Sequence, residues 1–199
     1  MKFVVVDTES FMCCLCHVRH LLSLACIFYT GERRFWLVAR PRCIVDYASW
    51  RIHKIPHCHA GVCLTSVLDE FHCAMERLSV THLVAHDVSS DLSLLLQECT
   101  ATKATTLLTY LCSIHHICTK LETMRLYRPS GRIVKWPSLR EAFFTTVGLQ
   151  LTVCHEATSD AEATACIFWY LTQLSKKQQN DTGRVLCSSD GQTAGPGIN

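Results

Sequence analysis

Short apolar runs that end in acidic residues are the most constraining feature of this 199-residue chain. Residues 2–6 form an apolar, valine-rich run that leads directly into Asp7, Thr8 and Glu9. Such a run is typical of a buried strand. Because strand side chains alternate between two faces, Asp7 and Glu9 are expected to point to the same face. The chain must therefore bury this strand while keeping two carboxylates at its end.

Similar runs recur along the sequence and alternate with helical patterns. Apolar residues at helical spacing predict a helix at residues 62–79. Ser138, Glu141 and Gly148 have the spacing of a capping box and a helix stop, and the histidine-rich residues 51–61 are expected to form a loop. The remaining expected elements are strands at residues 21–29, 34–39, 81–85 and 121–126, turns at residues 30–33 and 129–131, and helices at residues 90–96 (capped by Ser90), 107–118 and 159–174. This alternation indicates an α/β domain with a mixed sheet.

The domain is expected to occupy residues 1–175. After residue 175 the sequence becomes polar and then rich in glycine, serine and threonine, without apolar periodicity. Residues 176–199 are therefore interpreted as a flexible C-terminal tail.

The fourteen cysteines do not indicate a secreted disulfide framework. No basic and apolar signal sequence precedes Asp7, and many cysteines lie in apolar stretches, where a free thiol packs as a small hydrophobe. We interpret them as mostly reduced and expect an intracellular protein of the cytoplasm or nucleus. No apolar run approaches the ~20 residues that span a bilayer, so no membrane association is expected.

Further acidic residues lie near the predicted strand ends and helix starts. Asp91 follows the strand at residues 81–85, and Asp160 begins the last helix, five residues after His155. Carboxylate oxygens are ligands that Mg²⁺ prefers, and two such ions can hold an attacking water and a leaving oxygen in line. A nearby histidine can accept the proton of the water. The pattern fits metal-assisted hydrolysis of a phosphodiester. The net charge of +2 requires any nucleic-acid site to be a local patch that metal ions assist.

Three segments resemble the motifs of the DnaQ-like (DEDDh) exonucleases. The first is Val-Val-Val-Asp7-Thr-Glu9, and the second is Val84-Ala-His86-Asp-Val-Ser-Ser-Asp91. The third, His155-Glu-Ala-Thr-Ser-Asp160-Ala, is the most specific. Glu122-Thr-Met-Arg-Leu126 is also similar to a strand of the family, and Trp136-Pro-Ser-Leu139 to the start of its late helix. The resemblance covers residues 2–174 in the family's order.

This resemblance implies a ribonuclease H-like fold with a central five-stranded mixed sheet flanked by helices. It also implies a 3′→5′ exonuclease that uses two Mg²⁺ or Mn²⁺ ions to release nucleoside 5′-monophosphates from the 3′ ends of single-stranded DNA or RNA. The implied metal ligands are Asp7, Glu9, Asp91 and Asp160, the implied general base is His155, and the implied substrate contacts are Thr8, Ser10, His53 and Ile55. The sequence departs from the family at Ser10-Phe11, at Asp87 in place of asparagine and at Ser90 in place of phenylalanine.

Several alternatives stay open. The chain could be a catalytically inactive nucleic-acid or protein-binding module on the same fold. It could also act with a polymerase in trans or as a homodimer. Structural zinc is a further alternative, because three segments offer soft ligands, but none has two ligand pairs at finger-like separation. These segments are Cys13-x-x-Cys16 with His17 and His20, His57-Cys58-His59, and Cys112-x-x-His115-His116-x-Cys118.

Overall fold

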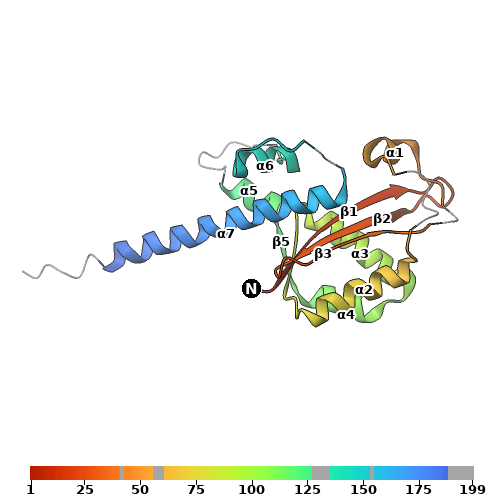
Figure 1. Ribbon diagram of the computed structural model, residues 1–199, viewed down its shortest axis with the longest axis horizontal. Coiled ribbons are helices and arrows are strands. Elements are labelled where there is room, and N and C mark those ends of the chain that lie inside the picture. The colour runs from red at the N-terminus through yellow and green to blue at the C-terminus, as the bar shows by residue number, and fades with distance from the viewer. Residues whose placement is uncertain (41–42, 56–60, 127–134, 153–154, 188–199) are drawn as a thin grey trace, which may run out of the picture.

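The computed structural model describes residues 1–40, 43–55, 61–126, 135–152 and 155–187, with side chains as far as residue 177. These residues form a mixed five-stranded sheet in the order β3-β2-β1-β4-β5 with helices on both sides (Figure 1). The strands are β1 Phe3–Met12, β2 Arg19–Phe28, β3 Arg33–Leu37, β4 His82–Ala85 and β5 His115–Cys118; the helices are α1 Tyr47–His53, α2 Leu64–Arg77, α3 Val88–Thr102, α4 Thr105–Ser113, α5 Thr119–Leu126, α6 Leu139–Val147 and α7 Ala157–Cys187. The expected α/β class and five-stranded mixed sheet are confirmed.

The acidic strand β1 lies at the centre of the sheet. It pairs antiparallel with β2, where Val5 lies opposite Ile27, and parallel with β4, where Val5 lies opposite Val84. The register with β2 shifts between Glu9 and Ser10. Such a bulge re-aims the side chains beside it. The central position explains why residues 4–6 are apolar and fully buried.

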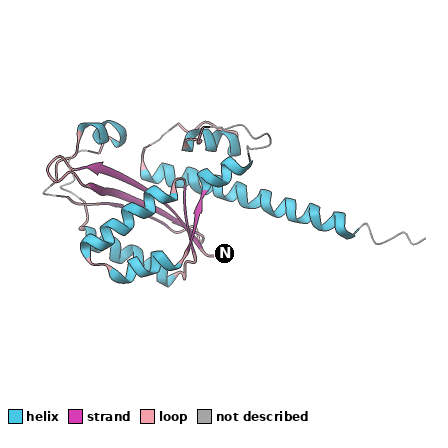
Figure 2. Cartoon of the chain, turned by 180° about the vertical axis from the view of Figure 1, so that it is seen from behind, coloured by secondary structure: helices cyan, strands magenta, loops and turns pink. Residues whose placement is uncertain are grey.

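The two faces of the sheet are covered by different helices. Alternate strand residues, Val4 and Val6 among them, pack with apolar residues of α2, α3 and α4. On the opposite face, Val5 and Val84 pack against Phe168 of α7. Small residues let α7 approach β2, because Ala25 contacts Ala157 and Ala161. Figures 1 and 2 show α7 crossing this face and extending beyond the rest of the fold.

Two helices follow their local sequence signals closely. In α2, the predicted apolar residues Val67, Leu68, Phe71 and Met75 are fully buried. At the start of α6, the Ser138 side chain accepts a hydrogen bond from the Glu141 backbone N–H, and the Glu141 carboxylate accepts one from the Ser138 N–H. Gly148 ends this helix with φ +79°, a left-handed conformation that glycine adopts at little cost. The predicted capping box and helix stop are confirmed.

Two predictions at the sheet edge are wrong. The apolar run at residues 107–118 is not one helix but α4 followed by β5, which pairs parallel with β4. Residues 121–126 are not a strand but belong to α5, whose buried Thr119 and Thr123 lie one helical turn apart. The cause in both cases is that a short apolar run does not distinguish a helix from a strand, and pairing with β4 decides.

Other boundaries also differ from expectation. Residues 51–53 are not loop but the last turn of α1, which begins after Asp46, whose carboxylate accepts from the Ser49 N–H. Ser90 does not cap α3, because Asp87 holds the N-cap position, and the helix runs on to Thr102. The turn expected at residues 129–131 lies outside the described residues.

The last helix was expected to end at residue 174 but continues to Cys187, so residues 176–187 of the expected tail are helical. The division into a domain of residues 1–175 and a tail stays a prediction. None of the described helices combines the length and the apolar character needed to cross a bilayer.

Candidate active site

The first two carboxylates come from the second half of β1. Asp7 and Glu9 follow the buried residues 4–6 and lie on the sheet face that α7 covers, in line with Val5. Glu9 is 9% exposed, so little of its carboxylate is in contact with bulk water. A central strand thus fixes both groups on a rigid element.

Asp91 reaches the same place from α3. Its Oδ1 accepts a hydrogen bond from the Thr8 hydroxyl at 2.6 Å and one from the Thr8 backbone N–H at 3.1 Å. Asp91 lies in the first turn of α3 and is 7% exposed. Both donors of Thr8, expected to face the terminal nucleotide, are therefore engaged by Asp91.

The third motif closes the cluster from the start of α7. Oδ2 of Asp160 accepts the backbone N–H of His155 at 2.9 Å. His155 has φ +63°, a left-handed conformation that turns the chain sharply before the helix. As a result, ligand atoms of Glu9, His155 and Asp160 lie within 4.8 Å of one another. The first acidic motif and the histidine loop, far apart in the sequence, meet in space.

Burial raises the pKa values of all four carboxyl groups, and repulsion by neighbouring carboxylates adds to this effect. Burial raises the pKa of Asp7 well above its usual value, and the charges of Asp91, Asp160 and Glu9 raise it further. Burial and then Asp160 raise the pKa of Glu9 to about 7. Burial raises the pKa of Asp91 to about 6 despite its hydrogen bonds from Thr8, and burial likewise raises the pKa of Asp160. The negative charges of these carboxylates are therefore only partly offset by the surrounding protein.

The donor set fits a hard divalent cation. Oδ1 of Asp160 is buried, and among the described residues no group donates to it. Carboxylate oxygens are the donors that Mg²⁺ and Mn²⁺ prefer. A cation bound among them would remove the repulsion that raises these pKa values. Asp7, Glu9, Asp91 and Asp160 are the residues that could hold it.

One cation, Arg19, was missed by sequence reasoning. Its Nε donates to Oγ of Ser10 at 2.7 Å, and its terminal nitrogens donate to Oγ of Ser90 at 3.2 and 3.3 Å. Its charge lowers the pKa of Glu9 and of Asp91. No local signal marks Arg19, because it begins β2 and reaches the cluster only through the β1–β2 pairing.

Two of the other predicted residues have contacts away from the carboxylates. Ile55 packs beside Phe11 at the far end of β1. His53 is buried at the end of α1, and its Nδ1 accepts the Ile55 N–H at 3.1 Å. The substrate roles expected for Thr8, Ser10, His53 and Ile55 stay predictions. Asp87, the departure from the family motif, forms a 2.8 Å ion pair with Lys120.

The sheet order and the helices on its faces define the class of fold, which is the ribonuclease H-like fold, as expected. The zinc-bound E. coli ExoI–ssDNA complex has this fold, with a TM-score of 0.64 and 15% identity over 91% of this chain and 42% of ExoI. The Neurospora crassa Pan2 catalytic unit, with a protease and a nuclease domain, gives a TM-score of 0.59 and 11% identity over 97% and 30% of the two chains.

The chain thus spans less than half the length of either protein. At these identities the likeness shows the fold alone, and the ribonuclease H-like fold that the resemblance implied is confirmed. No protein-family model matches the sequence, and no curated protein matches it.

Proposed function

We propose that this protein is a metal-dependent 3′→5′ exonuclease that releases nucleoside 5′-monophosphates from nucleic-acid 3′ ends. The observation that carries the proposal is the convergence of Glu9, His155 and Asp160, whose ligand atoms lie within 4.8 Å of one another. Asp7 and Asp91 complete the cluster, because the charges of Asp91, Asp160 and Glu9 raise the pKa of Asp7 and the charge of Asp91 raises the pKa of Glu9. Phosphodiester hydrolysis by bound cations needs such a set of oxygen donors.

Each residue has a distinct role in this proposal. Asp7, Glu9, Asp91 and Asp160 hold two divalent ions, Mg²⁺ or Mn²⁺, which when bound would polarise the scissile phosphate and lower the pKa of water. His155, exposed beside the carboxylates, accepts a proton from the attacking water. The Asp160 carboxylate supports this role, because its hydrogen bond from the His155 backbone fixes the strained turn that presents the imidazole.

The solved structures with this fold support the substrate class. ExoI was crystallised with ssDNA, and the Pan2 unit contains a nuclease domain. Ser10 and Arg19 lie next to the carboxylates and are positioned to contact a phosphate or sugar of the terminal nucleotide. A phosphate contact by arginine carries no sequence preference, so we expect the enzyme to degrade ends of any sequence.

The test is digestion of 5′-labelled single-stranded DNA and RNA with Mg²⁺ or Mn²⁺. We expect a ladder of products shortened from the 3′ end, release of nucleoside 5′-monophosphates and inhibition by a 3′-terminal phosphate. Duplex DNA and RNA complete the panel, which assigns the preferred nucleic acid. Endonucleolytic products would contradict the proposed direction of attack.

Matched variants assign the activity to this site. Asp7→Asn removes one charge from the cluster without changing its size and is expected to abolish activity. Asp69→Asn, at an exposed carboxylate on α2, is expected to retain it. If the folded protein binds nucleic acid but neither binds divalent ions nor cleaves, the chain is an inactive binding module on this fold.

A further inference from the structure

A second group of metal-ligand side chains lies at the connection between β1 and β2, outside the carboxylate cluster. Ligand atoms of Cys13, Cys16 and His20 lie within 4.8 Å of one another, and Cys16 Sγ is 3.3 Å from His20 Nε2. With Zn–S near 2.3 Å and Zn–N near 2.0 Å, tetrahedral ligand atoms are about 3.5–3.8 Å apart. We propose that Cys13, Cys16, His20 and Cys43 form a structural site for a zinc-class divalent metal.

The fourth ligand comes from a separate segment of the chain. The Cys43 side chain lies beside Cys13. Its sulfur is outside the group of ligand atoms that lie within 4.8 Å of one another, so a small shift of this side chain would complete the site. Cys43 and Cys13 also pack in the same apolar cluster, with Phe11 and Leu22. Three thiols and one imidazole are a common ligand set of structural zinc. In the sequence, Cys13-x-x-Cys16 provides only one pair of ligands. The fold brings the other two ligands, His20 and Cys43, to this pair.

The turn around Cys13 has a defined backbone geometry. It is held by the His17 N–H, which donates to the Cys13 carbonyl at 2.9 Å, and His17 adopts φ +53°. The Cys14 N–H donates to the Ile44 carbonyl at 3.1 Å, which fixes this turn against the segment that follows Cys43. The backbone therefore holds Cys13 and Cys16 in place before any metal binds.

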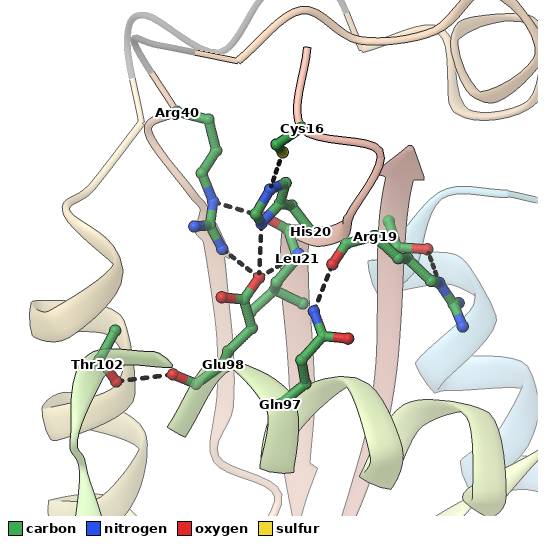
Figure 3. Close-up of polar contacts among 9 residues, drawn as sticks. Cys16, Arg19, His20, Leu21, Arg40, Gln97, Glu98 and Thr102 are labelled. Atoms are coloured by element: carbon green, nitrogen blue, oxygen red, sulfur yellow. Dashed lines mark hydrogen bonds and ion pairs between the residues drawn. The ribbon is translucent and has the colours of Figure 1, made fainter. Parts of the chain in front are cut away.

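The far ring nitrogen of His20 faces a buried carboxylate, the kind of outer partner that metal-bound histidines use. Its Nε2 faces Cys16, while its buried Nδ1 lies 3.6 Å from Oε1 of Glu98 (Figure 3). Glu98 is 1% exposed and is held by the Leu21 N–H at 2.8 Å and by Arg40. A carboxylate on the far nitrogen fixes the tautomer and orientation of a ligating imidazole. Glu98 would therefore be the outer-shell partner of this site.

The two clusters differ in the metal they select. Three sulfurs and an imidazole favour zinc, whereas the carboxylates of the candidate active site favour Mg²⁺ or Mn²⁺. A bound metal would tie the β1–β2 connection to residues 43–46, which already contact it through Cys14 N–H to Ile44 carbonyl and Asp46 N–H to Met12 carbonyl. Asp46 caps α1, so the site would anchor that helix. This inference does not rest on the nuclease function.

The test loads the full-length protein, purified under reducing conditions, with Zn²⁺ or Co²⁺. We expect one tightly bound zinc per chain at this site and, with Co²⁺, the thiolate-to-metal charge-transfer absorption of a tetrahedral complex. Asp7→Asn must keep this absorption, because the carboxylate cluster has no thiolate; zinc there would give no such band. Loss of nuclease activity alone therefore does not affect the result.

Single cysteine-to-serine variants identify which side chains bind the metal. Cys16→Ser is expected to fold, because Cys16 is exposed, and to weaken zinc binding at least about tenfold, the lower bound for loss of even an outer-shell partner. Cys43→Ser should do the same. Cys14→Ser, at an exposed neighbour outside the cluster, should leave binding unchanged.

Absence of the charge-transfer band, or an equal band in Cys16→Ser, would overturn the proposal. A disulfide between Cys13 and Cys43 in the reduced-purified protein, detected by mass spectrometry without bound metal, would overturn it as well.

Discussion

Thr8 and Asp91 are joined by two hydrogen bonds to one oxygen: Oδ1 of Asp91 accepts the Thr8 hydroxyl at 2.6 Å and the Thr8 N–H at 3.1 Å. Thr8 stands between Asp7 and Glu9 on β1, and Asp91 belongs to α3. The residue that separates the first two carboxylates thus positions the third. These hydrogen bonds also lower the pKa of Asp91 against the effect of its burial, so they favour the ionised form that binds cations.

Thr8→Val is expected to weaken binding of divalent ions while preserving the fold. It removes the hydroxyl donor but keeps the backbone N–H and the side-chain volume. A hydrogen bond to a charged group contributes roughly 1.5–3 kcal/mol, so we expect about ten- to hundredfold weaker Mg²⁺ or Mn²⁺ binding by calorimetry. Thr8→Ser, which retains the hydroxyl, is the control. Equal affinity in both variants would mean that the hydroxyl does not support Asp91.

Ionisation of Glu9 should lower the unfolding free energy of the metal-free protein as pH rises. The pKa of Glu9 is raised from 4.5 to about 7 in the folded state, so folding favours its protonated form. Protonated Glu9 makes its full contribution to the unfolding free energy below pH 4.5, and this contribution is lost as pH rises through 7. Partial or full burial lowers the pKa values of His20, His53 and His86, and these histidines change stability in the opposite direction. The effect of Glu9 is therefore measured as a difference between wild type and a Glu9 variant.

We predict that wild type, relative to Glu9→Gln, loses roughly 2 kcal/mol of unfolding free energy between about pH 5 and about pH 7.5 in chelator. Urea unfolding at both pH values measures this. Saturating Mg²⁺ should reverse the sign at the higher pH, because the ionised carboxylate then binds the cation. A constant difference across this range in chelator would show that Glu9 is not protonated in the folded state.

His155→Asn should slow turnover by about 10²–10⁴-fold, the range for loss of a general base. Asparagine tolerates the left-handed backbone at this position, and the variant keeps the N–H that binds Asp160. Divalent ion affinity, measured by calorimetry, should therefore change little. A large loss of affinity with proportionate loss of activity would instead make His155 a metal ligand.

Ala161→Leu should displace α7 from the sheet. Ala161 is fully buried against Ala25 of β2, and overpacking of this kind costs about 1–3 kcal/mol. A shift of Ala161 would also move the adjacent Asp160. Activity should therefore fall together with the urea concentration at the midpoint of unfolding. Cys166→Leu, on the exposed side of the same helix, should leave both within experimental error. Full activity in Ala161→Leu would show that close packing here does not position the third motif.

Local sequence signals were sufficient where the determining contacts are local. The Ser138–Glu141 capping box and the apolar spacing of α2 predicted their helices because hydrogen bonds and side-chain neighbours within one or two turns decide those structures. The order of acidic motifs likewise identified the carboxylates and His155 that the structure brings together. Their catalytic roles stay predictions.

Nonlocal pairing decided the elements that the sequence left ambiguous. Residues 115–118 became β5 because the free edge of β4 accepts a parallel strand there, and residues 119–126 then returned as α5. The apolar periodicity ends before residue 176, so it did not predict that α7 continues to Cys187.

The sequence by itself determined which side chains are available and the local structure around them: a buried strand ending in carboxylates, a capped late helix and a histidine loop before the last helix. The tertiary structure alone decided which distant groups meet, such as Arg19 with Ser90, Lys120 with Asp87 and Cys43 with Cys13. The physical reason is that such contacts depend on strand order and loop closure, whose free energy is distributed over the whole core rather than encoded at any one position.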